Sequence, residues 1–228
     1  MLQDRREGGR VLARKLKAFA SRTDVVVLGL PRGGVPVAYE VASALHAPLE
    51  VFLVRKLGMP GAEELAFGAL ASGGLRLVDE SLLRRYGVSA EEVERITERE
   101  RRELDRRELA YRGGRPALSL RGRVALLVDD GLATGSSMTA AILALRGAAP
   151  ARIVAAVPVA PAETCECLRQ TADAVVCALT PEPFEAVGRW YRDFDQTTDE
   201  EVRELLARAR AERSEESRAA STPAVEAG

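Results

Sequence analysis

Residues 124–138 read VALLVDDGLATGSSM and contain a strand, an acidic pair and a glycine loop in succession. The first five residues are apolar, which predicts a short strand buried on both faces of a parallel sheet. Asp129 and Asp130 follow directly, and a loop of small residues leads into an apolar, Ala-rich helix. This order predicts a ligand site, because open α/β sheets bind ligands outside the carboxyl ends of their strands.

The loop and the two acids suit different parts of one ligand. A helix N-terminus offers unpaired N–H groups and a partial positive charge, so a phosphate can bind where the loop meets the helix. Thr134, Ser136 and Ser137 add hydroxyl donors. The carboxylates would repel a phosphate, and they instead suit a cation or the hydroxyls of a vicinal diol. A ribose 5-phosphate offers a phosphate to the loop and a vicinal diol to the two acids.

Two common phosphate loops are excluded at this place. A P-loop needs Lys after its second glycine, and Gly135 is followed by Ser136. The dinucleotide fingerprint Gly-x-Gly-x-x-Gly is also absent here. The remaining alternative is a buried strand whose acids only cap the next helix.

Residues 127–138 resemble the phosphoribosyl pyrophosphate (PRPP) motif of the type I phosphoribosyltransferases. The resemblance implies a three-layer α/β/α fold with a mainly parallel central sheet. It also implies that Asp129 and Asp130 are catalytic acids that accept hydrogen bonds from the ribose 2- and 3-hydroxyls. The family places the 5-phosphate of PRPP in the loop, which here comprises Gly131, Ala133, Thr134, Gly135, Ser136, Ser137 and Met138.

A second strand, turn and helix predict a second anion site. Residues 25–30 are apolar, and the turn that follows them leads into a helix predicted over residues 35–45. In the resembled family this turn holds pyrophosphate, which assigns that role to Pro31, Arg32, Gly33 and Gly34. A strand predicted over residues 48–54 ends in two cations, and we expect Lys56 to contact the same pyrophosphate. The alternative for Lys56 is a solvated surface charge.

The resemblance implies a reaction in which a nitrogenous base or another nucleophile displaces pyrophosphate from PRPP, as in nucleotide metabolism and salvage. Mg²⁺ would bind through PRPP, with Asp129 and Asp130 nearby and no dedicated protein cage. Ala133 stands where hypoxanthine–guanine members carry an acid, which disfavours a 6-oxopurine acceptor. The alternatives are a regulator that senses PRPP or nucleotides without turnover, and a nucleotide-binding domain that docks a protein.

The chain order predicts one phosphoribosyltransferase domain over residues 1–210. Within it, residues 57–88 form a lid hairpin, residues 89–111 a charged helix, and residues 180–198 a hood. Phe184 and Trp190 belong to the hood and are candidates for a base pocket, although aromatic side chains of this kind also pack against neighbouring helices. The polar composition of residues 211–228 predicts a disordered tail.

The composition of the chain limits the kinds of partner that we expect it to bind. The formal net charge of −1 provides no global basic field, so we expect no nucleic-acid partner. No apolar run reaches about 18 residues, and the charged N-terminus lacks a signal core, so we expect no membrane contact and a cytoplasmic location. The three cysteines are interpreted as buried apolar residues rather than disulfide partners. The resemblance implies a homodimer.

Overall fold

A computed structural model describes the backbone of residues 1–221, and all their side chains except those of residues 63, 64, 217 and 219–221. Its centre is a five-stranded sheet in which every pairing is parallel. In sheet order the strands are β2 (Leu49–Val51), β1 (Val25–Gly29), β6 (Val124–Val128), β7 (Arg152–Val159) and β8 (Ala174–Leu179). This arrangement confirms the predicted mainly parallel sheet.

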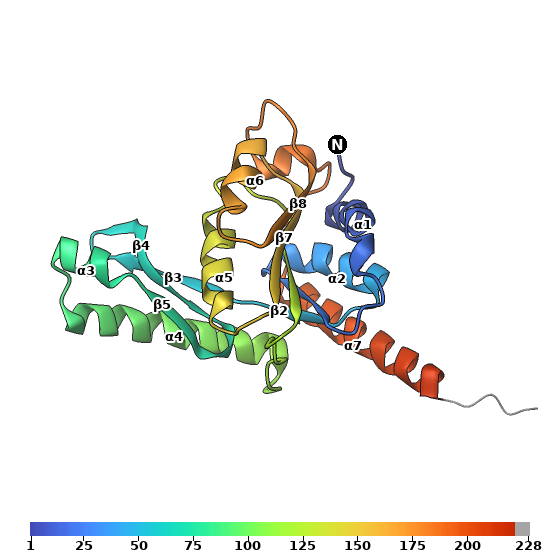
Figure 1. Ribbon diagram of the computed structural model, residues 1–228, viewed down its shortest axis with the longest axis horizontal. Helices are drawn as coiled ribbons and strands as arrows, with labels where there is room; N and C mark the ends of the chain where they lie inside the picture. The colour runs from blue at the N-terminus through green and yellow to red at the C-terminus, as the bar shows by residue number, and fades with distance from the viewer. Residues whose placement is uncertain (222–228) are drawn as a thin grey trace, which may run out of the picture.

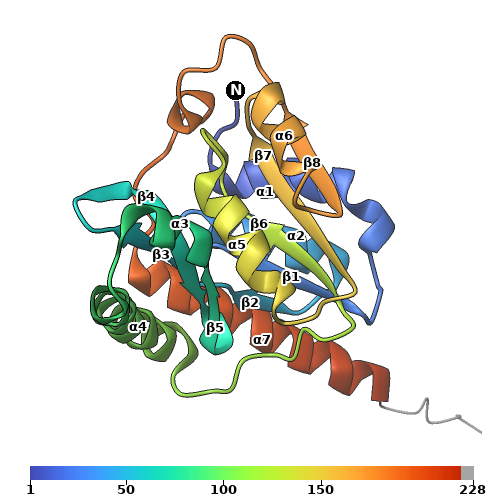
Figure 2. The same cartoon turned by 60° about the vertical axis from the view of Figure 1, so that its left-hand side comes forward.

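Helices cover both faces of the central sheet (Figures 1 and 2). One face packs against α1 (Arg5–Lys15), α2 (Gly34–Leu45) and α7 (Asp199–Ser221), and the other against α5 (Ser136–Arg146) and α6 (Ala162–Leu168). Successive residues of a strand point to opposite faces, so Val25 and Val27 lie in the first core and Val26 and Leu28 in the second. The three-layer α/β/α architecture is therefore confirmed.

The register of β1 and β6 aligns the ends of the two strands. Val25 lies opposite Val124, and Gly29 lies opposite Val128. Because both strands run in the same direction, the loops that follow them leave the sheet side by side. This alignment brings the two predicted anion loops to one place on the carboxyl edge.

A second sheet projects from one side of the central layer (Figure 1). It is antiparallel, with β4 (Ala62–Ala71) between β3 (Val54–Met59) and β5 (Leu75–Val78). The strands β4 and β5 form an antiparallel hairpin within residues 57–88, the segment predicted as a lid hairpin. The single strand predicted over residues 48–54 was wrong, because Leu49–Val51 belong to the central sheet and Val54 begins a strand of the second sheet. The described part of the chain also contains three short 3₁₀ helices, at Lys17–Phe19, Ser72–Gly74 and Val187–Trp190.

Two helices follow the antiparallel sheet, α3 (Glu80–Tyr86) and α4 (Ala90–Arg112). Ser89 and Glu92 form a capping box at the start of α4. The exposed side of α4 carries i,i+4 ion pairs such as Arg102–Glu98 and Arg107–Glu103. Val93, Ile96 and Leu104 are buried in the core, whereas Leu109 is exposed.

The last helix, α7, extends into the segment predicted as a disordered tail. Thr198 accepts a hydrogen bond from the N–H of Glu201 through its Oγ1 and so caps α7. The helix then continues to Ser221. The disordered tail predicted from residue 211 was therefore wrong over residues 211–221, because charged residues with high helix propensity can extend an anchored helix. Residues 222–228 lie outside the described part of the chain.

The cysteine prediction also needs correction. Cys165 of α6 and Cys177 of β8 form a disulfide, whereas Cys167 is a free and exposed thiol. An odd number of cysteines does not exclude one bridge, and the fold brings together two residues that the sequence alone could not pair.

We expect this disulfide to stabilise the fold. It closes a loop with a sequence separation of 12, for which the loss of unfolded-state entropy is about 3 kcal/mol. Urea denaturation with and without a thiol reductant should show a loss approaching that size. The Cys165→Ala/Cys177→Ala variant should be insensitive to the reductant. Equal stability in both conditions, with three reactive thiols in the folded protein, would contradict the bridge.

Candidate active site

The acidic pair lies where β6 leaves the sheet. All five residues of β6 are buried, whereas Asp129 and Asp130 are partly exposed at its carboxyl end. The Asp129 Oδ1 accepts the N–H of Asp130 at 2.9 Å, which fixes the first carboxylate against the turn. The Asp130 Oδ2 accepts a hydrogen bond of 2.7 Å from Nε of Arg5, which lies at the start of α1.

The two glycine loops touch at this place. A Cβ atom on Gly33 would lie 2.1 Å from the Asp130 Oδ2, and one on Gly34 would lie 2.7 Å from the carbonyl oxygen of Val128. Both glycines have helical or near-helical backbone angles, so closeness of the chains, not a positive φ, requires them. The structure therefore joins the predicted pyrophosphate turn to the predicted PRPP motif.

The loop between Asp130 and α5 presents donors at its rim. Thr134, Ser136 and Ser137 lie along it, and the Oγ atoms of Thr134 and Ser136 are 2.9 Å apart. Gly135 adopts a left-handed conformation with φ of +72° at the N-cap of α5, where it has no side chain to cap the helix. The N–H of Ser136 donates to the Thr134 Oγ1 at 3.4 Å, and the N–H groups of Ser137 and Met138 remain available to an anion.

Three other residues assigned to this loop have less freedom to contact a ligand. Met138 is fully buried, so only its backbone N–H could reach a ligand. The carbonyl of Ala133 accepts a hydrogen bond from Thr164 Oγ1 at 2.7 Å, and the loop is thereby tied to α6. Gly131 is buried against the hood, because a Cβ atom there would meet Val187 at 2.5 Å.

Lys56 lies on the antiparallel sheet and faces the predicted 5-phosphate loop. A cleft of about 850 Å³ separates that sheet from α5, and Lys56, Thr134 and Ser136 all line it. The lining does not include the turn of residues 31–34, so Lys56 lies beside the predicted 5-phosphate loop rather than the predicted pyrophosphate turn. Its neighbour Arg55 is bound to the buried Glu100 of α4 and is thus held away from a ligand role.

The hood closes over the acidic pair from the other side. The Tyr191 hydroxyl donates to the carbonyl of Asp130 at 2.5 Å, and the Phe194 ring stacks on Tyr191 with centroids 5.0 Å apart. Phe184 and Trp190, the candidates for a base pocket, are half-buried against Leu2 and its neighbours. Neither side chain belongs to a cluster with the C-terminal helix α7, which was the alternative interpretation of these aromatic residues.

Sequence reasoning missed Arg5 and Tyr191. The Arg5 guanidinium lies 3.8 Å above the Phe194 ring and donates to the carbonyl of Asp195, so it connects α1, the hood and Asp130. The contact between Arg5 and Asp130 joins residues 125 positions apart. Nothing in the local pattern around either residue signals such a partner. Only the tertiary fold could have identified them.

Burial makes the ionised forms of the two neighbouring carboxylates unfavourable. Burial, followed by the charge of Asp130, raises the pKa of Asp129 well above its ordinary value. Burial also raises the pKa of Asp130, although the hydrogen bond from Arg5 opposes that effect. The pKa of the Tyr191 phenol is raised by burial and then by Asp130. A ligand that brings hydroxyl donors or a cation would stabilise the ionised pair.

Residues 1–221, as far as their side chains are described, contain no group of three or more metal-ligating side chains of the His, Cys, Asp and Glu types. The acidic pair nevertheless suits a divalent cation that arrives with its own oxygen ligands, since Mg²⁺ is commonly bound through one or two carboxylates plus substrate phosphates. Among the described helices, none is both long enough and apolar enough to span a membrane.

Comparison with known proteins identifies the family. Residues 2–186 match the model of the phosphoribosyl transferase domain. The chain belongs to the phosphoribosyl transferase family. A Mycobacterium tuberculosis protein, from strains H37Rv and CDC 1551, is named a phosphoribosyl transferase as a provisional assignment. It is 44% identical over 209 residues, which cover 92% of this chain and 47% of that protein.

This chain spans about half the length of those curated relatives. The crystal structure of TT1426 from Thermus thermophilus is also 44% identical, with a TM-score of 0.82, and the match covers 91% of this chain and 98% of that one. The fold is that of the type I phosphoribosyltransferases.

The raised pKa of Asp129 predicts a pH-dependent gain from Asp129→Asn. Above the ordinary carboxyl pKa, the folded state holds a proton that the unfolded state releases, so wild-type stability falls as pH rises through that window. The variant lacks this penalty, so its advantage in stability over wild type should be larger at about pH 8 than at about pH 4, the ordinary carboxyl pKa. Urea denaturation at both pH values measures the difference.

Asp173→Asn is a control for which the expected change in stability has the opposite sign. The Arg146 hydrogen bond and charge lower the pKa of Asp173, so Asp173→Asn should be less stable than wild type near neutral pH, with the difference shrinking at acid pH. If Asp129→Asn loses stability at the higher pH as Asp173→Asn does, the account of the buried pair is wrong.

The loop contact predicts that Gly34→Ala destabilises the protein. The added methyl group would meet backbone atoms of Val128 and Asp129, which cannot rotate away. Overpacking of this kind costs about 1–3 kcal/mol, measured by urea denaturation. Gly147→Ala is the matched control, because its nearest atom is the flexible end of the Leu75 side chain at 3.1 Å. Equal stabilities of the two variants would argue against the contact.

Proposed function

We propose that this protein transfers the 5-phosphoribosyl group of PRPP to a nitrogenous base or another nucleophile and releases pyrophosphate. The observation that carries the proposal is the meeting of two glycine loops over one acidic pair at the carboxyl edge of the sheet. A ligand with phosphates at both ends of a ribose would place its diol between them. Family membership supports the same substrate class.

Each loop has a distinct role in this proposal. The α5 N-terminus, with the hydroxyls of Thr134 and Ser136, would hold the 5-phosphate, and Lys56 would add a charge from across the cleft. The turn from Pro31 to Gly34 would hold pyrophosphate, with Arg32 as its cation. These anion contacts would fix the ribose so that its hydroxyls reach the acids.

Asp129 and Asp130 would accept hydrogen bonds from the ribose hydroxyls and stabilise positive charge that develops at the anomeric carbon. Bound Mg²⁺ would neutralise the pyrophosphate leaving group. Arg5 occupies Asp130 in this structure, so PRPP would have to take over that carboxylate or share it. The antiparallel sheet, which borders the cleft, would exclude water as a lid.

We assign the acceptor only to a chemical class, that of a nitrogenous base or another nucleophile. Phe184 and Trp190 supply half-buried aromatic surface in the hood, which suits stacking against a base. Ala133 provides no acid beside Thr134, so the proposal disfavours acceptors that need one there. The homodimer, the cytoplasmic location and a place in base salvage remain predictions from the family resemblance.

Calorimetric titration with Mg²⁺–PRPP tests the binding half of the proposal. Asp130→Asn removes a charge-assisted acceptor worth about 1.5–3 kcal/mol and should weaken binding by roughly one to two orders of magnitude. Asp105→Asn is the control, because Asp105 is exposed on α4, away from the cleft. Binding that is equally strong in all three proteins would refute the assignment of the acids.

Pyrophosphate release, assayed against a panel of purine and pyrimidine bases, tests turnover. Release that depends on one base and is lost in Asp130→Asn would establish the transferase and name the acceptor. Tight PRPP binding without release for any base would favour the alternative, a non-catalytic sensor of PRPP or nucleotides.

A further inference from the structure

A basic cleft lies at the edge of the central sheet opposite the acidic pair. It measures about 660 Å³ and is lined by five arginines and one acid: Arg115, Arg123, Arg210, Arg213, Arg218 and Glu50. Arg123 immediately precedes β6 and Asp129 immediately follows it, so six extended residues, about 20 Å, separate this cleft from the proposed PRPP site.

Three separate segments contribute the charges. The segment that joins α4 to β6 provides Arg115 and Arg123, the second half of α7 provides three more arginines, and Glu50 comes from β2. Figure 2 shows the segment between α4 and β6 running beside α7. The formal net charge of the chain is −1, so this concentration is local and could not be recognised from composition.

Three of these arginines lack carboxylate partners. In the part of the chain that the structure describes, no ion pair engages Arg115, Arg123 or Arg210. The nearby Arg213 donates to a carbonyl, that of His46, at 3.3 Å. Some arginines on exposed helix faces elsewhere are paired, as Arg102 is with Glu98. The cleft therefore collects three cations that form no ion pair with the described residues.

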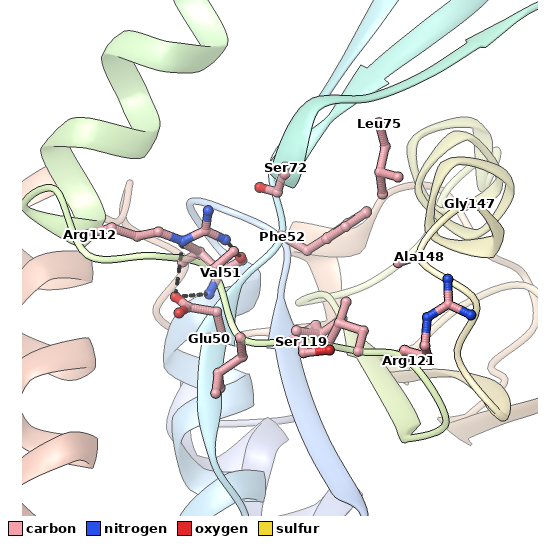
Figure 3. A pocket seen from close by; sticks show the side chains of 15 residues that line it. Glu50, Val51, Phe52, Ser72, Leu75, Arg112, Ser119, Arg121, Gly147 and Ala148 are labelled. Carbon is pink, nitrogen blue, oxygen red and sulfur yellow. Dashed lines mark hydrogen bonds and ion pairs between the residues drawn. The ribbon is translucent and has the colours of Figure 1, made fainter.

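The one acid that lines the cleft is already engaged. The Glu50 Oε1 lies 3.5 Å from Nε of the buried Arg112 and accepts the N–H of Val51 at 3.0 Å. Figure 3 shows Glu50 turned toward Arg112, within the adjoining cavity of about 280 Å³. Arg112 is further held by Glu108 at 2.7 Å and by the Val51 carbonyl at 3.1 Å. Glu50 is thus held by Arg112 and forms no ion pair with the described arginines that line the cleft.

Mutual repulsion within the cleft affects one side chain directly. Burial, followed by the positive charge of Arg115, lowers the pKa of Arg210, and the charge of Glu50 only partly opposes this effect. An anion bound between these two side chains would remove this repulsion and accept hydrogen bonds from both guanidinium groups.

We propose that this cleft binds a polyphosphate anion, such as the oligophosphate group of a nucleotide. Guanidinium groups match phosphate oxygens with paired N–H donors, and several of them together suit a ligand with several charges in a small volume. A cavity of about 660 Å³ lies within the usual range for small-molecule sites. This site is separate from the PRPP site, and its test does not depend on turnover.

Calorimetric titration with inorganic tripolyphosphate tests the proposal. The Arg115→Gln/Arg210→Gln variant should lose about tenfold or more in affinity, because it removes two charge-assisted donor groups. The control Arg102→Gln/Arg203→Gln removes the same charge, and one of its substitutions lies on α7, but both arginines are paired with glutamates. The control should bind as wild type does. Any binding at the PRPP site is common to all three proteins.

Equal affinities in the cleft variant and the control would overturn the proposal, because total charge alone would then explain binding. If the double variant fails to fold, as judged by circular dichroism, Arg123→Gln provides the same test. Tighter binding of a single-stranded RNA than of tripolyphosphate, lost in the cleft variant, would overturn the small-ligand assignment in favour of a nucleic acid.

Discussion

The close approach of two strand-to-helix loops is the constraint on which the rest of the site depends. The carboxyl ends of β1 and β6 are aligned in the sheet. This alignment brings Gly33 and Gly34 against the backbone and carboxylates of Asp129 and Asp130. No side chain fits between the loops, so glycine is required at both positions. This packing gives a single surface with two candidate anion-binding turns and an acidic centre. The hood, the antiparallel sheet and α1 then enclose that surface.

Charge is distributed unevenly around this framework. The acids are held together at the carboxyl edge, where Arg5 opposes them, and their pKa values rise because of burial. At the opposite edge, five arginines line one cleft whose single acid is bound to Arg112. Both arrangements are costly for the isolated chain, and both would be relieved by ligands of the matching charge. A protein with nearly no net charge thus carries an acidic pair at one edge of its central sheet and a cluster of arginines at the other.

The sequence predicted much of this architecture because its signals are local. Five buried residues followed by two acids and a small-residue loop define β6 and the start of α5 whatever surrounds them. The antiparallel strand β3 was missed because its apolar residues continue those of β2 without a clear break. Arg5, Tyr191 and the arginine cleft were missed for another reason. Each depends on contacts between distant segments, which neither periodicity nor composition records.

Hydrogen–deuterium exchange with and without Mg²⁺–PRPP tests most directly whether the two loops form one site. The account predicts that the ligand slows exchange in residues 31–35 and in residues 131–138 together, with the same dependence on PRPP concentration. It also predicts that residues 147–151, which precede β7 at the opposite edge of the sheet, keep their exchange rates. Protection of one loop alone, or of neither, would contradict the claim that their contact creates the PRPP site.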